Sequence, residues 1–244
     1  MKKNYSDLKN IFFKQLTVND IAETLTSPSD IDKLSEFAQE SGYDSILYLD
    51  NSGKYYVYEN ISRISAPLEH DEVISDSTPL KQAFEFIVKN RRVFIKSGNR
   101  IDKIATISDL NKISFRIWMF GIISILEMKL RIFILENLLE DWQRSLSPGR
   151  LNKVKTLYSQ REQKNMQIDL IECIQLIDAL AIITENEDLQ SKIAPDMTKK
   201  KFTKSFEKLN NIRDELAHSN QSFSNEWSEI LDSLNFAENL IEKM

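Results

Sequence analysis

The sequence predicts an α+β N-terminal half followed by an all-α helical bundle. All five glycines lie at or before position 149, and residues 150–244 contain none. Turn sequences such as DNSGK and KSGNR occur only in the first hundred residues, which indicates strands and hairpins there. The change falls near residue 112 and predicts an N-terminal domain of residues 1–112 and a C-terminal domain of residues 113–244.

Composition places the chain among ordinary globular proteins. Apolar residues make up 41% and charged residues 28% of the 244 residues, enough to bury a core. The net charge of −5 argues against a protein that coats nucleic acid through bulk charge, so any such contact must come from local basic patches. The single cysteine, Cys173, excludes an intrachain disulfide and a cysteine-rich zinc site.

No segment of the sequence has the properties of a signal peptide or a membrane span. The N-terminal run MKKNYSDLKN lacks an apolar core, so we expect a cytoplasmic protein. The most apolar stretch, residues 117–126, is far shorter than the roughly 20 residues that cross a bilayer. We therefore expect a buried helix there and no membrane partner.

Two stretches of the N-terminal half repeat one pattern. Residues 29–61 align with residues 78–110 at an offset of 49, which places Ile31 opposite Leu80. Each stretch predicts a short amphipathic helix, an apolar strand, a hairpin that contains glycine, and a second strand. The shared order favours duplication over chance. The first strands of the two repeats are predicted at residues 46–49 and 93–95.

This arrangement resembles a tandem pair of CBS domains, a regulatory module that binds adenine nucleotides. In that family a strand precedes each unit, which implies strands at residues 16–21 and around 71–75. The second repeat ends in ATISDL, which is similar to the Thr-x-x-Asp that closes the family's motif. The resemblance implies that Thr106 contacts phosphate and that Asp109 binds the ribose hydroxyls of an adenine nucleotide. One carboxylate can accept both hydroxyl donors.

The first repeat departs from the CBS pattern. Its ending, YVYENI, has Asn60 where the family has aspartate and Val57 where the family has threonine. Only one of two nucleotide sites is therefore expected to be intact. The alternative interpretation of TISDL is a strand end followed by an aspartate that caps a helix.

Helical periodicity continues through the C-terminal half. One long apolar helix is predicted over 115–142, ended by the SPG sequence at 147–149. Residues 150–164 are predicted to form a lysine-rich connector, with a phosphate-contacting rim as the alternative. In the next helix Glu172 and Asp178 are expected to face solvent. The remaining helices of the bundle are predicted at 166–184, from about 198 into the run 211–220, and at 224–243.

The run NIRDELAHSN, residues 211–220, holds the strongest candidates for chemistry. Arg213 falls within the apolar stripe of its helix, whereas His218 points about 140° away. A charged side chain on an apolar face needs a partner or a function, because burying it unpaired is unfavourable. The alternative is two polar residues at the end of an ordinary helix. The other histidine, His70, is predicted to be a surface residue.

The same run resembles the Arg-polar-x-x-x-His motif of HEPN domains, which are helical bundles that dimerise. The resemblance covers roughly residues 115–244 by pattern, and only the ten-residue run is specific. Many HEPN domains are metal-independent ribonucleases. The resemblance implies that Arg213 stabilises charge on the phosphate, that His218 is the acid or base or positions the leaving group, and that Asp214 orients one of them.

Together, the two resemblances predict a nucleotide-regulated, metal-independent endoribonuclease with a toxin-like or antiviral defence role. The protein would be a cytoplasmic homodimer that pairs through its C-terminal half, cleaves RNA without a catalytic cofactor, and takes an adenine nucleotide as its regulatory ligand. Residues of two protomers would converge in one cleft, so Arg213 is predicted near a twofold interface, with Glu127 and Arg131 on the dimer face. The alternatives are a non-catalytic nucleotide-sensing scaffold and a HEPN toxin controlled by a separate antitoxin.

Overall fold

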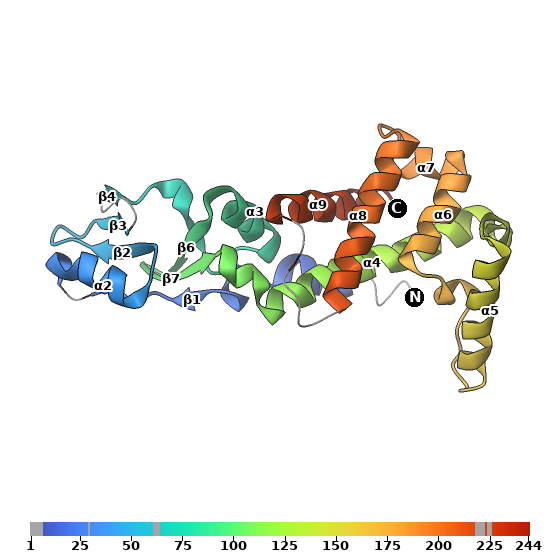
Figure 1. The fold of residues 1–244 in the computed structure, drawn as a ribbon, viewed down its shortest axis with the longest axis horizontal. Helices are drawn as coiled ribbons and strands as arrows, with labels where there is room; N and C mark the ends of the chain where they lie inside the picture. Colours follow the sequence, from blue (N-terminus) through green and yellow to red (C-terminus); the bar gives the residue numbers. More distant parts are fainter. Residues whose placement is uncertain (1–6, 29, 61–63, 218–222, 224–225) are drawn as a thin grey trace. The chain divides into compact units, whose positions relative to one another are not determined.

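The computed structural model describes residues 7–28, 30–60, 64–217, 223 and 226–244. They divide into an N-terminal unit of residues 13–115 and a helical unit that joins residues 7–12 to residues 116–244. A sheet-rich N-terminal region is followed by a helical C-terminal region, which confirms the predicted fold class at this level (Figure 1).

The N-terminal unit contains two sheets. Their strand orders are β1-β7-β6-β5 and β2-β3-β4. Strand β5 runs parallel to β6, whereas every other described pair is antiparallel. The elements in chain order are β1 (Glu23–Thr24), α2 (Leu34–Ser41), β2 (Ser45–Leu49), β3 (Tyr55–Glu59), β4 (Ile64–Pro67), β5 (Val73–Ser75), α3 (Leu80–Asn90), β6 (Arg92–Ser97) and β7 (Arg100–Thr106).

Both repeats contain the predicted order of helix, strand, hairpin and strand. The first is α2-β2-β3, and the second is α3-β6-β7. The hairpins turn at Gly53, with a φ of 82°, and Gly98, with a φ of 60°. Glycine adopts this left-handed conformation without a steric penalty. The strand expected around residues 71–75 is β5, which lies beside β6.

The strand predicted at residues 16–21 is wrong. Thr17 forms a single bridge with Pro79, and Val18–Asp20 then fold into a 3-10 turn. The carboxylate of Asp20 accepts the backbone N–H of Thr17 at 2.7 Å, which stabilises this turn. A local side-chain cap therefore replaces the extended conformation. The first strand comes later, as β1, and pairs with β7.

Apolar side chains of the N-terminal unit gather on both faces of the β2-β3-β4 sheet. Ile46 packs against Leu34 and Ala38 of α2 on one face. Leu47 packs with Phe94 of β6 on the other face. Because neighbouring residues of a strand point to opposite faces, β2 contributes to both clusters. The second cluster joins the two sheets.

The helical unit is built around one long apolar helix, α4. Its apolar residues are buried around most of the circumference, which agrees with the prediction of burial on more than one side. Phe202 and Phe206 of α8 pack with Phe236 of α9 at centroid distances of 5.7 and 6.3 Å. The helices are α4 (Ile113–Leu138), α5 (Pro148–Glu162), α6 (Leu176–Glu185), α7 (Glu187–Ile193), α8 (Lys199–Ala217) and α9 (Trp227–Lys243).

A glycine inside α4 makes room for the segment that precedes the N-terminal unit. The ring of Phe12 occupies the space into which a side chain at Gly121 would project. Trp118 Nε1 also donates a hydrogen bond to the carbonyl oxygen of Phe12 at 2.8 Å. Helix α4 thereby covers part of its apolar surface. In the described part of the chain, no helix combines the length and the apolar character that crossing a bilayer requires.

The SPG sequence begins a helix instead of ending one. Helix α4 already ends at Leu138, and Leu139 takes a left-handed φ of 49°. Ser147 then caps α5 by accepting the backbone N–H of Arg150. Pro148 follows at the first helical position, where its missing N–H has no partner to lose. The lysine-rich connector predicted at 150–164 is therefore helical as far as Glu162, where α5 ends.

The helix predicted over 166–184 is wrong in its first half, because Leu170–Cys173 form a separate 3-10 turn before α6. The carboxylate of Asp178 accepts the backbone N–H of Gln175 at 2.7 Å and caps α6 there. Asp178 was expected to face solvent, yet it is only 3% exposed. Two nitrogens of Arg150 bind its carboxylate at 2.5 and 2.7 Å. This ion pair joins α5 to α6.

We expect Asp178→Ala to lower the free energy of unfolding of the helical unit by about 3 kcal/mol, because it leaves the Arg150 guanidinium without its carboxylate and removes the α6 cap. The exposed pair of Asp141 and Arg144, at 3.3 Å, supplies the control. Asp141→Ala should change stability by less than about 0.5 kcal/mol. Urea unfolding followed by circular dichroism measures both variants, and equal losses would contradict the expectation.

Candidate functional site

Arg213 lies on α8, at the border of the face that packs into the helical unit. Four apolar residues of α8 are buried on that face: Phe202, Phe206, Leu209 and Ile212. The Arg213 side chain keeps 33% of its surface exposed. The guanidinium is therefore neither solvated like a surface arginine nor enclosed in the core.

Two carboxylates hold the Arg213 guanidinium. Its Nε lies 3.5 Å from Oε1 of Glu127 on α4, and its Nη1 donates to Oδ1 of Asp214 at 3.1 Å. The other oxygen of Asp214 accepts a hydrogen bond from Nδ2 of Asn210 at 3.2 Å. The structure thus brings Arg213 and Asp214 together, and Asp214 lies where it can orient the guanidinium. Among the described residues, none binds Nη2 of Arg213.

Glu127 also connects Arg213 to Arg131. Oε2 of Glu127 lies 3.5 Å from Nη2 of Arg131, one helical turn along α4. The same nitrogen of Arg131 donates to the carbonyl oxygen of Ile174 at 3.1 Å. Both residues are partly buried, where opposite charges stabilise one another more than in water. Of the two residues assigned to the dimer face, Glu127 contacts Arg213 directly, and Arg131 contacts Glu127.

A third arginine, Arg116 of α4, contacts the C-terminal part of α8 and is not among the residues that the sequence singled out. Its Nη2 donates to the carbonyl oxygen of Glu215 at 3.0 Å. Its guanidinium also stacks over the ring of Phe223 at 4.8 Å. The only sequence signal was a charge at the start of the most apolar helix. Its contacts depend on how α4 crosses α8, which no local pattern encodes.

His218 lies outside the described residues, which stop at Ala217 and resume at Phe223. The geometry of the Arg213 and His218 pair therefore stays a prediction. His70, the other histidine, is exposed, and Glu69 next to it begins a short 3-10 turn.

The two residues that the CBS resemblance assigns to a nucleotide form a helix cap. Oδ2 of Asp109 accepts the backbone N–H of Thr106 at 2.7 Å and its hydroxyl at 2.9 Å. Oδ1 of Asp109 lies 2.7 Å from Nζ of Lys112. Thr106 and Asp109 are thus in contact, and Asp109 is buried. Three protein donors already use the carboxylate that the resemblance assigns to a ribose.

Lys112 joins this cap to the segment that leads into β1. Its Nζ donates to the carbonyl oxygen of Ile21 at 2.7 Å and lies 2.9 Å from Oε1 of Glu23. Burial alone would lower the pKa of Lys112, but the hydrogen bonds and negative charges of Asp109 and Glu23 outweigh it and raise the pKa. The lysine therefore stays charged at neutral pH and balances the buried carboxylate.

The same cap occurs a second time in the N-terminal unit. Thr17 and Asp20 repeat the Thr-x-x-Asp spacing, and Asp20 caps the turn as Asp109 does. Asp20 is exposed, whereas Asp109 is buried. The TVND sequence was the signal for this cap, and it was interpreted as part of a strand. An aspartate that caps a helical turn was the alternative interpretation of TISDL, and this second cap has the same form.

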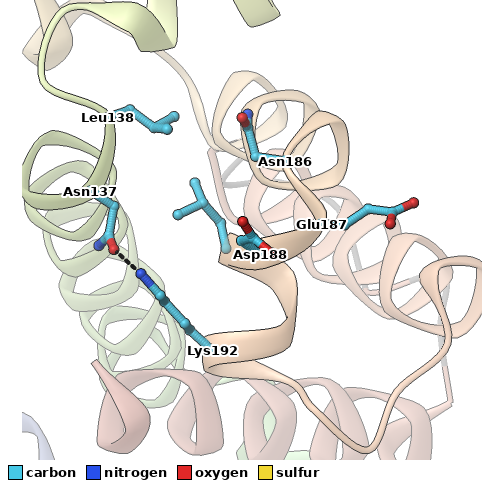
Figure 2. A pocket seen from close by; sticks show the side chains of 7 residues that line it. Asn137, Leu138, Asn186, Glu187, Asp188 and Lys192 are labelled. Atoms are coloured by element: carbon cyan, nitrogen blue, oxygen red, sulfur yellow. Dashed lines mark hydrogen bonds between the residues drawn. The ribbon is translucent and has the colours of Figure 1, made fainter.

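Two cavities occur away from these residues. The first, of about 380 Å³, lies between the end of α4 and the start of α7, where Lys192 Nζ donates to Oδ1 of Asn137 at 2.6 Å (Figure 2). The second, of about 650 Å³, lies in the N-terminal unit and is lined by His70 and Lys96 among others. Neither is lined by Arg213, Asp214 or the Thr106 cap. In the described part of the chain, no cluster of three His, Cys, Asp or Glu side chains has metal-binding geometry.

We expect Asp109→Ala to destabilise the N-terminal unit by about 2 kcal/mol, because it removes a cap and leaves Lys112 without its buried partner. Asp20→Ala is the matched control, because it removes the exposed copy of the cap, and it should lose only about 0.5–1 kcal/mol. Thermal unfolding of both variants tests this. If Asp20→Ala lowered the stability more than Asp109→Ala, burial would not determine how much each cap contributes to the stability of the unit.

Comparison with protein-family models, with curated proteins and with solved structures finds no match to this chain.

Proposed function

We propose that this protein is a metal-independent endoribonuclease of the HEPN type that acts as a homodimer and that an adenine nucleotide regulates. The observation that carries the proposal is the state of Arg213. Two carboxylates orient its guanidinium, a third of the side chain is exposed, and Nη2 has no partner among the described residues. A guanidinium that is oriented, partly exposed and has a nitrogen without a partner among the described residues can donate a hydrogen bond to a phosphate oxygen.

The chemistry needs only groups that this chain supplies. The 2′-hydroxyl of RNA attacks the adjacent phosphorus, the new 2′-O–P bond forms, and the P–O5′ bond breaks. His218 accepts the 2′-hydroxyl proton and then donates it to the departing 5′-oxygen, so that the protons balance. Arg213 donates hydrogen bonds to the phosphoryl oxygens as their negative charge increases. Asp214 keeps the guanidinium oriented.

Dimerisation through α4 would complete this site. Ile117 and Phe120 are 55% and 48% exposed, although the rest of the apolar stretch of α4 is largely buried. Ser124 and Glu127 follow them at helical spacing on the same side of α4. Glu127 contacts Arg213, so a second protomer that covers Ile117 and Phe120 and extends two turns along this side of α4 would approach the guanidinium. A toxin-like or defence role follows from the HEPN resemblance.

The regulatory ligand would act on the N-terminal unit, with Thr106 and Asp109 as its proposed contacts. An adenine nucleotide that uses Asp109 has to share the carboxylate with Lys112 or replace one of the cap hydrogen bonds. Its effect on cleavage is limited to the difference between its affinities for the active and inactive dimers. The resulting change at the cap would be the first structural effect of binding.

A non-catalytic nucleotide-sensing scaffold is the second candidate. It is favoured by the internal partners of the charged groups, because Glu127 and Asp214 occupy two nitrogens of Arg213. Under this alternative, the arginine ties α8 to α4 and has no substrate.

We expect the wild-type protein to cleave labelled RNA in EDTA. Arg213→Ala and His218→Ala should each lower the rate at least about a hundredfold, because each removes a transition-state contact. Arg144→Ala is the control, since Arg144 is a highly exposed arginine of the same unit. The reactions are run with and without ATP, AMP or adenosine. If RNA stays intact with wild-type protein under every condition, the scaffold is the better assignment.

We also expect Phe120→Glu to convert the dimer into a monomer, because it places a charge in the proposed apolar contact. Ile177→Glu is the matched control, since Ile177 is an exposed isoleucine on α6 of the same unit. Sedimentation velocity measures the mass of each protein. A monomeric wild type, or equal dissociation of both variants, would rule out the α4 interface.

A further inference from the structure

Helix α5 and the turn that follows it are basic in an acidic chain. Residues 148–165 contain five lysines and arginines and one acidic residue, whereas the whole chain has a net charge of −5. A local surplus of this kind, rather than the bulk charge, is what attracts a polyanion to such a protein.

The helix is held by a narrow strip of its surface. Val154 is the only buried residue of α5, and the helix makes its main contacts with the turn Leu170–Cys173. Figure 1 shows α5 extending away from the other helices of the helical unit. Arg150 fastens the start of α5 to Asp178, and Arg161 donates to the carbonyl oxygen of Glu172 at 3.5 Å near its end. The arginines thus anchor the helix.

Three lysines of this segment have no structural task. Lys153, Lys155 and Lys164 are exposed, and none of them pairs with a carboxylate in the described part of the chain. Lys153 lies on α5, whereas Lys164 lies in the turn that follows the end of α5 at Glu162. Lys155 projects from a different side of α5. The cations are therefore distributed over an accessible, elongated surface.

The neutral side chains between these lysines specify the kind of anion. Neutral side chains that form hydrogen bonds are exposed on α5 and its turn, among them Asn152, Thr156, Ser159, Gln160 and Gln163. A lipid surface would need several large apolar residues beside the lysines, whereas α5 buries Val154 and the exposed large apolar residue next to this segment is Met166. Amides and hydroxyls beside cations match a sugar-phosphate backbone, which offers both phosphate oxygens and 2′-hydroxyls.

We propose that the exposed surface of α5, through Lys153, Lys155 and Lys164, binds the sugar-phosphate backbone of RNA. This inference rests on the proposed ribonuclease function and assigns a substrate-binding surface to it. Binding there is independent of base sequence, because the contacts are made to phosphate and ribose. The surface adds affinity and leaves the chemical step to Arg213 and His218.

The test compares two triple variants of the full chain with equal loss of charge. Lys153→Gln, Lys155→Gln and Lys164→Gln form the α5 variant. Lys199→Gln, Lys200→Gln and Lys201→Gln, at the exposed start of α8, form the control. All proteins also carry His218→Ala so that the RNA is not cut. Fluorescence anisotropy with a labelled single-stranded RNA is recorded at several salt concentrations, and circular dichroism checks the fold.

We expect the α5 variant to bind RNA at least about tenfold more weakly at ~0.1 M salt. The slope of log affinity against log salt should become less steep by about 2, because each phosphate contact contributes about 0.7 on a single strand. The control should change affinity by less than about threefold. An unchanged α5 variant, an equal loss in the control, or no RNA binding at all would overturn the proposal.

Two further results separate this inference from the proposed function. If the α5 lysines are needed for RNA binding but wild-type protein never cleaves RNA, the binding surface stands and the nuclease assignment fails. If wild-type protein cleaves RNA and the α5 variant, with His218 restored, cleaves it with an unchanged KM, the surface is overturned and the nuclease assignment stands. Anionic vesicles or poly-glutamate that bind through these lysines, while RNA does not, would assign the surface to another partner and overturn it as well.

Discussion

The carboxylate of Glu127 is the contact on which the candidate site depends. It lies within 3.5 Å of guanidinium nitrogens of both Arg213 and Arg131, in a partly buried part of the helical unit. Partly buried cations need a partner of opposite charge, and one carboxylate on α4 provides it for residues of two helices. The position of Arg213 therefore follows from the packing of α4 against α8, and a change at Glu127 would affect the whole group.

Carboxylates have a second role in this protein, because they decide where helical turns begin. Asp20, Asp109 and Asp178 each accept the backbone N–H of the residue three positions earlier. Asp109 and Asp178 are buried, and each also meets a cation, Lys112 or Arg150. The local cap and the tertiary ion pair thus use the same carboxylate. A substitution at Asp109 or Asp178 would therefore remove both interactions at once.

The basic residues of α5 and its turn fall into two groups: arginines that hold the helix in place and lysines that are exposed to solvent. Arg150 and Arg161 fasten α5 to the helical unit, whereas the lysines of the same helix point to solvent without partners in the described part of the chain. Guanidinium groups suit the first task because their planar fork forms two bonds at once, and ammonium groups on flexible stems suit mobile contacts with a polyanion. The proposed RNA surface and the proposed catalytic arginine thus belong to one helical unit with different tasks.

Hydrophobic periodicity was enough to predict the order of elements in both repeats, the buried character of α4 and the extents of α8 and α9 to within a few residues. It also placed Arg213 on the border of an apolar face. The partners of the buried carboxylates, in contrast, depend on how the helices pack. That packing buried Asp178 against Arg150 and made Arg116 a contact of α8. Apolar spacing reports which side of an element is buried, whereas an ion pair between distant residues depends on the packing of whole helices.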